Sequence, residues 1–197
     1  MRKVTLITLM AVAVFVLSGC GSKQAETGFL SDYSKLQKEG SALRYVNEKE
    51  LAQYSSFIVD KVEVHLYEGE KAKGKLTEEE IGDLTNYMHA KIVEAVENVG
   101  KTVVYQPADG VARIRTALTD LDASNAVTII PQASLLGAGL GGAATEAEVV
   151  DSMTDQQIAA FVLKQQGSRI PFTNLGEWTA SKQVMDDWAK KFQKHIE

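Results

Sequence analysis

Cysteine is almost absent from this chain of 197 residues, which contains only Cys20. Without a second cysteine no intramolecular disulfide can form, and most cysteine metal frameworks and cysteine-based catalysis are excluded. Lysine and arginine nowhere form a basic run. Binding to nucleic acid is therefore not expected, because neutralising phosphates requires clustered positive charge.

Several motifs of enzymes are also missing. The glycine cluster at 137–142 lacks the Gly-Lys-Ser/Thr of a phosphate-binding loop, and a strand-like pattern follows it rather than a helix. No Gly-x-Ser-x-Gly occurs, which argues against a serine hydrolase. His65, His89 and His195 show no ligand spacing such as i, i+4, and we expect them on the solvated surface. The sequence predicts no metal site, no cofactor and no catalytic residue.

What the chain does have is a three-part N-terminus. Arg2 and Lys3 precede an apolar run of about 14 residues, 4–17, and small residues follow it. This layout is typical of a secretory signal peptide. Spanning a bilayer core takes roughly 20 residues, so the run is too short to favour a permanent transmembrane helix.

The apolar run ends in Leu17-Ser18-Gly19-Cys20, which resembles the bacterial lipobox. The resemblance implies cleavage between Gly19 and Cys20, a diacylglycerol thioether on Cys20, and acylation of the new amino terminus with a chain such as palmitate. An inert cysteine in an ordinary cleavable signal and an uncleaved anchor helix are the alternatives. Gly21 is not the aspartate that signals inner-membrane retention in lipoproteins this one resembles, so we expect the periplasmic face of the outer membrane.

The expected organisation is a signal peptide at 1–19, a flexible tether at 20–27 and one domain at 28–197. After cleavage, 19 basic and 26 acidic residues give a net charge of −7. Attraction to anionic lipid would be weak, so attachment to the membrane depends on the acyl chains of Cys20.

Apolar periodicity predicts two helices. Thr77 and Glu80 form a capping box before the first, which ends at Gly100, and the second begins between Asn174 and Glu177. Strands are predicted at 57–67, 102–105, 111–121 and 145–152. The segment 158–165 fits a strand or a helix, and we favour a strand; 28–46 suggests a wrapped segment. The predicted fold class is α+β, a mainly antiparallel sheet with two amphipathic helices packed on one face.

Two groups of residues are candidates for function. Asp120 with Asp122 and Glu146 with Glu148 are acid pairs that could support acid–base chemistry only if their environments separated the pKa values, and solvated faces are the favoured interpretation. No charge occurs between Asp122 and Glu146. We predict a partner-contact loop there, because exposed apolar stretches are otherwise costly; a loop packed under the sheet is the alternative. Its contact residues would be Leu135, Leu136 and Leu140.

The mature chain resembles, over nearly its whole length, a bacterial lipoprotein family defined only as a domain of unknown function. The segments that carry the resemblance are 28–36, 43–46, 117–120, Asp151-Ser152 and the tryptophan-containing helix at 178–192. A Thr-Gly step is expected in the turn that follows, whereas this chain has Thr154-Asp155. The family implies no activity, so no catalytic residue is transferred.

Three functions are compatible with these features. The leading hypothesis is a non-enzymatic, lipid-anchored binding or assembly module of the bacterial envelope, with the membrane and an envelope protein as its partners. The alternatives are a periplasmic enzyme that uses acidic residues near Asp120, and a passive structural lipoprotein.

Overall fold

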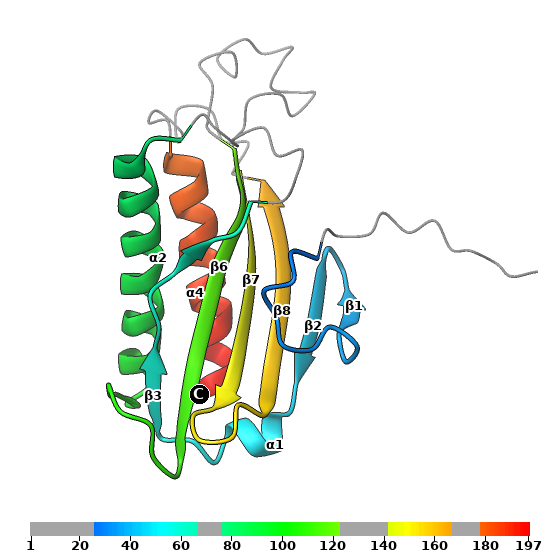
Figure 1. Ribbon diagram of the computed structural model, residues 1–197, viewed down its shortest axis with the longest axis vertical. Coiled ribbons are helices and arrows are strands. Elements are labelled where there is room, and N and C mark those ends of the chain that lie inside the picture. Colours follow the sequence, from blue (N-terminus) through cyan, green and yellow to red (C-terminus); the bar gives the residue numbers. More distant parts are fainter. Residues whose placement is uncertain (1–25, 67–75, 123–141, 167–177) are drawn as a thin grey trace, which may run out of the picture.

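A computed structural model describes residues 26–66, 76–122, 142–166 and 178–197. These residues form an eight-stranded sheet and three helices, which confirms the α+β class (Figure 1). The strands are β1 Gln37–Glu39, β2 Ala42–Val46, β3 Ser56–Val59, β4 Glu63–Val64, β5 Thr102–Val103, β6 Val111–Asp122, β7 Gly142–Asp151 and β8 Gln157–Gln166. The helices are α1 Glu48–Leu51, α2 Glu78–Asn98 and α4 Thr179–Ile196.

The sheet is mainly antiparallel, as predicted, and its order is β1-β2-β8-β7-β6-β3-β5, with β4 paired to β6. The long strands β6, β7 and β8 form an antiparallel meander at its centre. Three pairings on one side are parallel, namely β3 with β5, β3 with β6, and β4 with β6. The sequence did not predict them, because they join segments about 50 residues apart through the intervening α2.

Two of the predicted elements, 57–67 and 28–46, differ from what the structure shows. The single strand expected at 57–67 is interrupted between β3 and β4. There the Asp60 carboxylate accepts a hydrogen bond from Arg113 of β6, with 3.0 Å between Oδ1 and Nη1. The segment expected to wrap, 28–46, does so only in its first half. Its second half is the β1–β2 hairpin, whose turn uses Gly40 at φ +62°, a conformation that glycine adopts at no steric cost.

The ambiguous segment is a strand, as favoured. β8 pairs with β7 over its length, and Asp155 occupies the turn between them with φ +57°. Asp155 thus takes the left-handed position where a Thr-Gly step would place glycine, and aspartate tolerates that conformation better than most residues do. The same side chain pairs with Arg115 of β6.

Local signals fix both ends of α2. The Thr77 hydroxyl accepts from the Glu80 amide, and the Glu80 carboxylate accepts from the Thr77 amide, so the predicted capping box is present. Gly100 follows the helix with φ +74°, as a C-terminal glycine should.

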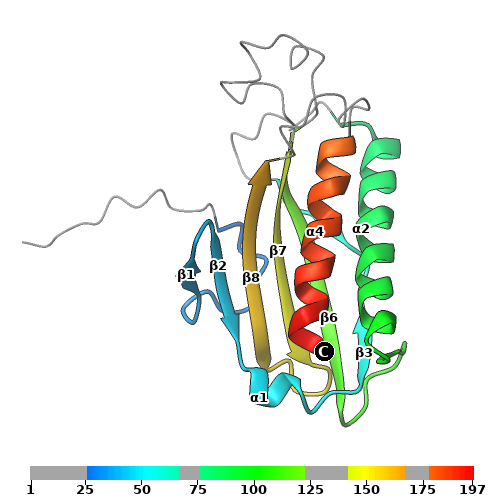
Figure 2. The same ribbon diagram turned by 180° about the vertical axis from the view of Figure 1, so that it is seen from behind.

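Both long helices lie on the same side of the sheet. α2 and α4 lie side by side behind the sheet in Figure 1 and in front of it in Figure 2, so they cover one of its faces.

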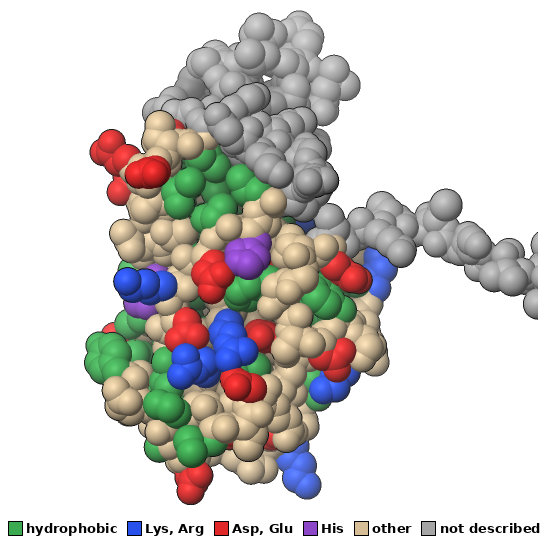
Figure 3. All heavy atoms as spheres, viewed as in Figure 1, with side chains coloured by type: hydrophobic (Ala, Val, Ile, Leu, Met, Phe, Trp, Pro, Cys, Tyr) green, Lys and Arg blue, Asp and Glu red, His purple; other side chains and the backbone are tan. Residues whose placement is uncertain are grey.

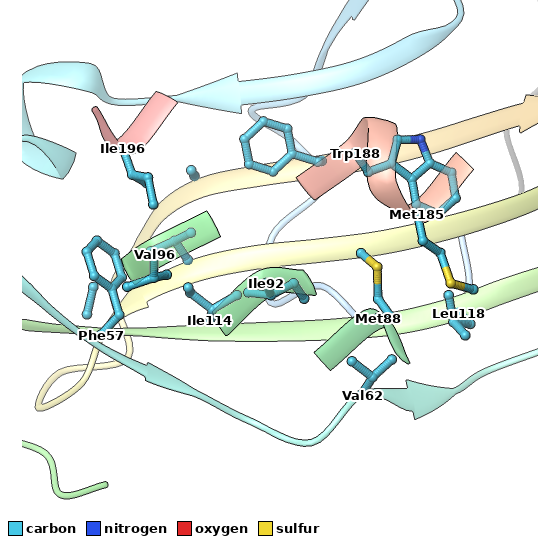
Figure 4. Close-up of a cluster of buried hydrophobic side chains, with 14 of the residues drawn as sticks. Phe57, Val62, Met88, Ile92, Val96, Ile114, Leu118, Met185, Trp188 and Ile196 are labelled. Carbon is cyan, nitrogen blue, oxygen red and sulfur yellow. The ribbon is translucent and has the colours of Figure 1, made fainter. Parts of the chain in front are cut away.

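One large core lies between these helices and the sheet. Figure 4 shows Met88, Ile92 and Val96 from α2, and Met185 and Trp188 from α4, near Ile114 and Leu118 of β6. A smaller cluster on the other face joins Leu30 to Ala160 and Val162 of β8. None of the described helices combines the length and the apolar composition that a membrane span requires.

Candidate functional site

The central strand β7 presents different side chains to the two faces of the sheet. Thr145, Ala147 and Val149 border a cavity on the helix side. Glu146 and Glu148 alternate with them, as the period-two geometry of a strand requires, and lie on the opposite face. Both glutamates are nevertheless fully buried, at 0% and 1% exposure. The expectation that this acid pair forms a solvated face is therefore wrong.

Residues 27–33, here called the N-terminal strap, bury these carboxyl groups. Thr27 donates to Glu146 twice, from its amide at 2.9 Å and from its hydroxyl at 3.0 Å. The Tyr33 hydroxyl also donates to Glu146. Burial, and then the hydrogen bond to Glu146, raise the pKa of Tyr33, so the phenol remains a donor in neutral solution.

Glu148, two residues after Glu146 on β7, binds the strap at Ser31. Ser31 donates to it from its amide at 3.0 Å and from its hydroxyl at 2.7 Å. Gln157 of β8 donates to the same oxygen at 3.0 Å, and Arg115 reaches the other at 3.5 Å. Buried carboxyl groups are costly unless they are hydrogen-bonded. The strap supplies the three bonds described for Glu146 and two of the four described for Glu148.

Apolar contacts complete the attachment of the strap. Leu30 is 5% exposed and packs on Ala160 and Val162. The Phe29 ring meets the His65 ring edge-on, with centroids 5.2 Å apart. Thr27, which the sequence analysis assigns to the tether, is thus the first described residue bonded to the sheet.

Around the strap, this face of the molecule carries both signs of charge in close proximity (Figure 3). Arg113 pairs with Asp60 at 3.0 Å, and Lys164 pairs with Asp120 at 2.7 Å. Asp120 is only 9% exposed and its carboxylate is held in this ion pair, so the expectation of a solvated face is wrong for Asp120 as well. The side chain of Asp122 lies outside the described residues.

The second feature is a cavity of about 510 Å³ on the helix side of the sheet. Its walls are mostly apolar and come from α2, α4, the central strands and the β1–β2 hairpin. Four of the apolar wall residues, Met88, Ile92, Ile114 and Trp188, are labelled in Figure 4. The remaining apolar wall residues are Ala42, Ala147, Val149, Phe161, Leu163, Ala189 and Phe192. Trp188 is therefore a core residue, as expected, and also a wall of the cavity.

One polar atom of the cavity wall lacks a hydrogen-bond partner in the part of the chain that the structure describes. Thr116 of β6 is 2% exposed, and among the described residues its hydroxyl makes no hydrogen bond. An unpaired buried hydroxyl costs about 1–3 kcal/mol. Threonine at this position is thus unfavourable for packing alone.

Charged residues surround the mouth of the cavity. Arg44 contacts the Glu39 carboxylate through Nε at 2.8 Å and the His195 ring through Nη1 at 3.1 Å. Lys191 and Lys194 of α4 line the same region. Burial, reinforced by the Arg44 guanidinium, lowers the pKa of His195 below its usual 6.5.

The three histidines have separate environments. His195 is half-buried beside Arg44, so the expectation of a solvated surface position is wrong for it. His65 pairs with Glu63 at 2.7 Å, and His89 lies 3.3 Å from the Val59 carbonyl oxygen. Across 26–66, 76–122, 142–166 and 178–197, no three His, Cys, Asp or Glu residues gather as a metal site would require.

Several predicted sites lie outside the described residues: Gly19, Cys20, and the loop residues Leu135, Leu136 and Leu140. Of the glycine cluster, Gly142 is described, and it begins β7. A Cβ atom there would lie 2.7 Å from the Gln165 carbonyl oxygen, so Gly142 permits close approach of two strands. This is a packing role within the sheet.

Sequence reasoning predicted that the strap segment wraps, but it did not predict that the strap binds Glu146 and Glu148, and it did not identify the mouth of the cavity. Arg44 and His195 are 151 positions apart, and Thr27 and Glu146 are 119 apart. The one usable signal for the strap was the apolar spacing of Phe29, Leu30 and Tyr33 in a segment without clean periodicity.

Comparison with solved structures finds similar chains at low identity. The PelC dodecamer from Paraburkholderia phytofirmans is 7% identical, with a TM-score of 0.43 over 75% of this chain and 97% of that one. A variant PelC dodecamer from the same organism is 11% identical, with a TM-score of 0.45 over 79% and 95%. A protein from Caulobacter crescentus CB15 described as a "putative lipoprotein" is 7% identical, with a TM-score of 0.32 over 76% and 91%.

Comparison with curated proteins finds no match. Residues 25–192 match a protein family described as "Protein of unknown function (DUF3313)", and this range contains the strap, both buried glutamates and α4 except its last turn. The chain belongs to the DUF3313 family.

Proposed function

We infer that this protein is a non-enzymatic, lipid-anchored binding module of the bacterial envelope, attached through acyl chains on Cys20. The observation that carries the inference is the attachment of the strap to Glu146 and Glu148. It fixes the chain to the sheet at Thr27, seven residues after the cysteine. Seven residues span at most about 25 Å, so an anchored domain would remain within that distance of the bilayer surface.

A strap of this kind suits a tethered protein better than a free one. Two buried carboxyl groups on a central strand are expensive to desolvate, and an apolar pair would pack there more cheaply. Their placement makes sense if the segment behind the anchor must stay bound to the domain. Two or three acyl chains would then hold the whole domain at the membrane, since stable anchoring needs more than one chain.

The non-enzymatic part of the proposal is supported by the partners of the acidic residues. Glu146 and Glu148 bind the strap, and Asp120 binds Lys164. These three carboxyl groups, which were candidates for acid–base chemistry, are thus engaged in structural contacts. The proposed face for partners is the uncharged loop with Leu135, Leu136 and Leu140.

Membrane fractionation of cells tests the lipid anchor and the membrane in which the protein resides. The wild-type protein should be found in the outer membrane, and Cys20→Ser should abolish acylation and signal cleavage. Gly21→Asp should move the protein to the inner membrane if the retention rule of similar lipoproteins applies. Ser22→Asp, one position further on, is the matched control and should leave the protein in place. An unchanged distribution of Cys20→Ser after alkaline washing would contradict the lipid anchor.

Photo-crosslinking tests the binding role. A crosslinker at Leu136 or Leu140 should give the same discrete adduct in intact cells, whereas one at exposed Lys38 on β1 should not. Loss of the adduct in Gly21→Asp cells would tie the partner to the outer membrane. If neither loop position gives a specific adduct in a folded protein, the passive structural alternative is favoured.

A further inference from the structure

The helix-side cavity has the form of a ligand site rather than a packing defect. Its volume of about 510 Å³ lies within the range of roughly 300–1,000 Å³ for small-molecule sites. Native cores are packed close to crystal density and leave few voids larger than a water molecule. The unpaired Thr116 hydroxyl in its wall is a second, independent indication, because a bound molecule or its associated water would satisfy that group.

The geometry points to an elongated, single-chain amphiphile with an anionic head, of the long-chain carboxylate class, as the molecule that binds in this cavity. Its chain would lie between α4 and the sheet, along Trp188, Ala147 and Phe161. Its head would lie at the mouth beside Arg44, Lys191 and Lys194.

Charge at the mouth favours an anion over a neutral or cationic head. Three permanent cations line the cavity, against the carboxylate of Glu39 and that of Glu48, which is close enough to act on His195. Glu148 also borders the cavity, but its carboxyl oxygens are bound to Ser31, Gln157 and Arg115. Arg44 contacts Glu39 and His195 through Nε and Nη1, and a guanidinium has five N–H donors, so it can also bind a carboxylate.

The acyl chains of the protein's own anchor are a poor fit for the cavity. The strap that follows Cys20 crosses the opposite face of the sheet, where Thr27 is bonded to Glu146. A chain on Cys20 would have to pass around the sheet edge to reach Trp188. The ligand is therefore a separate molecule, and the inference does not depend on the lipid anchor.

Tryptophan quenching tests the proposal directly, because Trp188 lines the cavity and Trp178 does not. The mature full-length protein in phosphatidylcholine vesicles is titrated with 12-bromododecanoate and with 12-bromododecanol, whose bromine quenches indole fluorescence on contact. We expect saturable quenching that is lost in Trp188→Phe, with the carboxylate at least tenfold tighter than the alcohol. Shortening the chain should weaken binding about fourfold per methylene.

Variants separate the cavity from the bilayer. Ala147→Leu should fill the cavity and weaken quenching at least tenfold, with Ala42→Leu as a second filling variant if the first does not fold. Arg44→Gln should remove most of the preference for the carboxylate, whereas Lys190→Gln, on the same helix as Lys194 and outside the cavity, should not. A parallel titration with a brominated lysophosphatidylglycerol distinguishes a free fatty acid from a lysolipid as the ligand. Tighter binding of the fatty acid or of the lysolipid supports a single-chain anionic amphiphile.

Three results would overturn the proposal. The first is equal quenching by carboxylate and alcohol. The second is quenching that persists unchanged in both folded filling variants. The third is an absence of saturable quenching by either anionic amphiphile.

Discussion

Replacing Glu146 should release the N-terminal strap without unfolding the sheet. In Glu146→Leu, the side chain keeps a similar volume but loses both acceptors for Thr27 and Tyr33. A hydrogen bond to a charged group is worth about 1.5–3 kcal/mol net. Three such bonds set an upper limit, and Thr27 is half-exposed, so water recovers part of the loss. We therefore expect strap opening to become easier by about 3 kcal/mol.

Residue-resolved amide hydrogen exchange measures this change. A decrease of about 3 kcal/mol corresponds to roughly hundredfold faster exchange. It should appear at Thr27, and also at Ser31, whose amide binds Glu148, because the strap opens as a unit. Amides of β7 and β8 should exchange nearly as in wild type, since replacing a buried ionic group by an apolar one is often neutral for the core.

Glu146→Gln should have an intermediate effect, because the glutamine side chain retains one acceptor oxygen. We expect it to accelerate amide exchange in the strap about tenfold. Glu94→Gln, an exposed carboxylate on α2, is the control and should change nothing in the strap. If the amides of Thr27 and Ser31 exchanged in Glu146→Leu at the wild-type rate, the Glu146 carboxyl group would not be what holds the strap on the sheet.

Three further substitutions test the fold. Thr77→Ala should lower the free energy of unfolding by about 1 kcal/mol in urea titration, because it removes the N-cap of α2; no change in midpoint would show that the cap is not used. Gly142→Ala should cost about 1–3 kcal/mol by the same assay, since its Cβ would lie 2.7 Å from the Gln165 carbonyl oxygen, and an unchanged midpoint would contradict the close approach of β7 and β8. His195 has a lowered pKa in the folded state, so its contribution to stability is present above pH 6.5 and is lost as pH falls below it. In His195→Asn, the free energy of unfolding should depend less steeply on pH in this range. An equally steep dependence would mean that other groups cause it.

Local signals in the sequence were sufficient to predict the parts of the fold that depend on neighbouring residues. Thr77 and Glu80 cap α2 within one helical turn, and most of β7 was predicted as a strand. The local pattern of β8 fitted a strand or a helix, and its pairing with β7 makes it a strand. The β1–β2 hairpin and the parallel position of β3 were not predicted. Strand order depends on pairings between distant segments, which no local pattern encodes.

The functional surfaces were largely beyond sequence reasoning for the same reason. The alternation of Glu146 and Glu148 indicated one face of a strand, and charged residues on such a face are usually solvated. Here a segment about 117 residues earlier in the chain covers that face, so the carboxyl groups are buried and bonded. The cavity mouth likewise brings Arg44 of β2 to His195 of α4.

The intact mass of the protein purified from its native envelope tests the lipid anchor most directly. The account predicts a chain that begins at Cys20 and carries a diacylglyceryl group with an additional amide-linked acyl chain. A mass that includes residues 1–19, or a free thiol on Cys20, would contradict it.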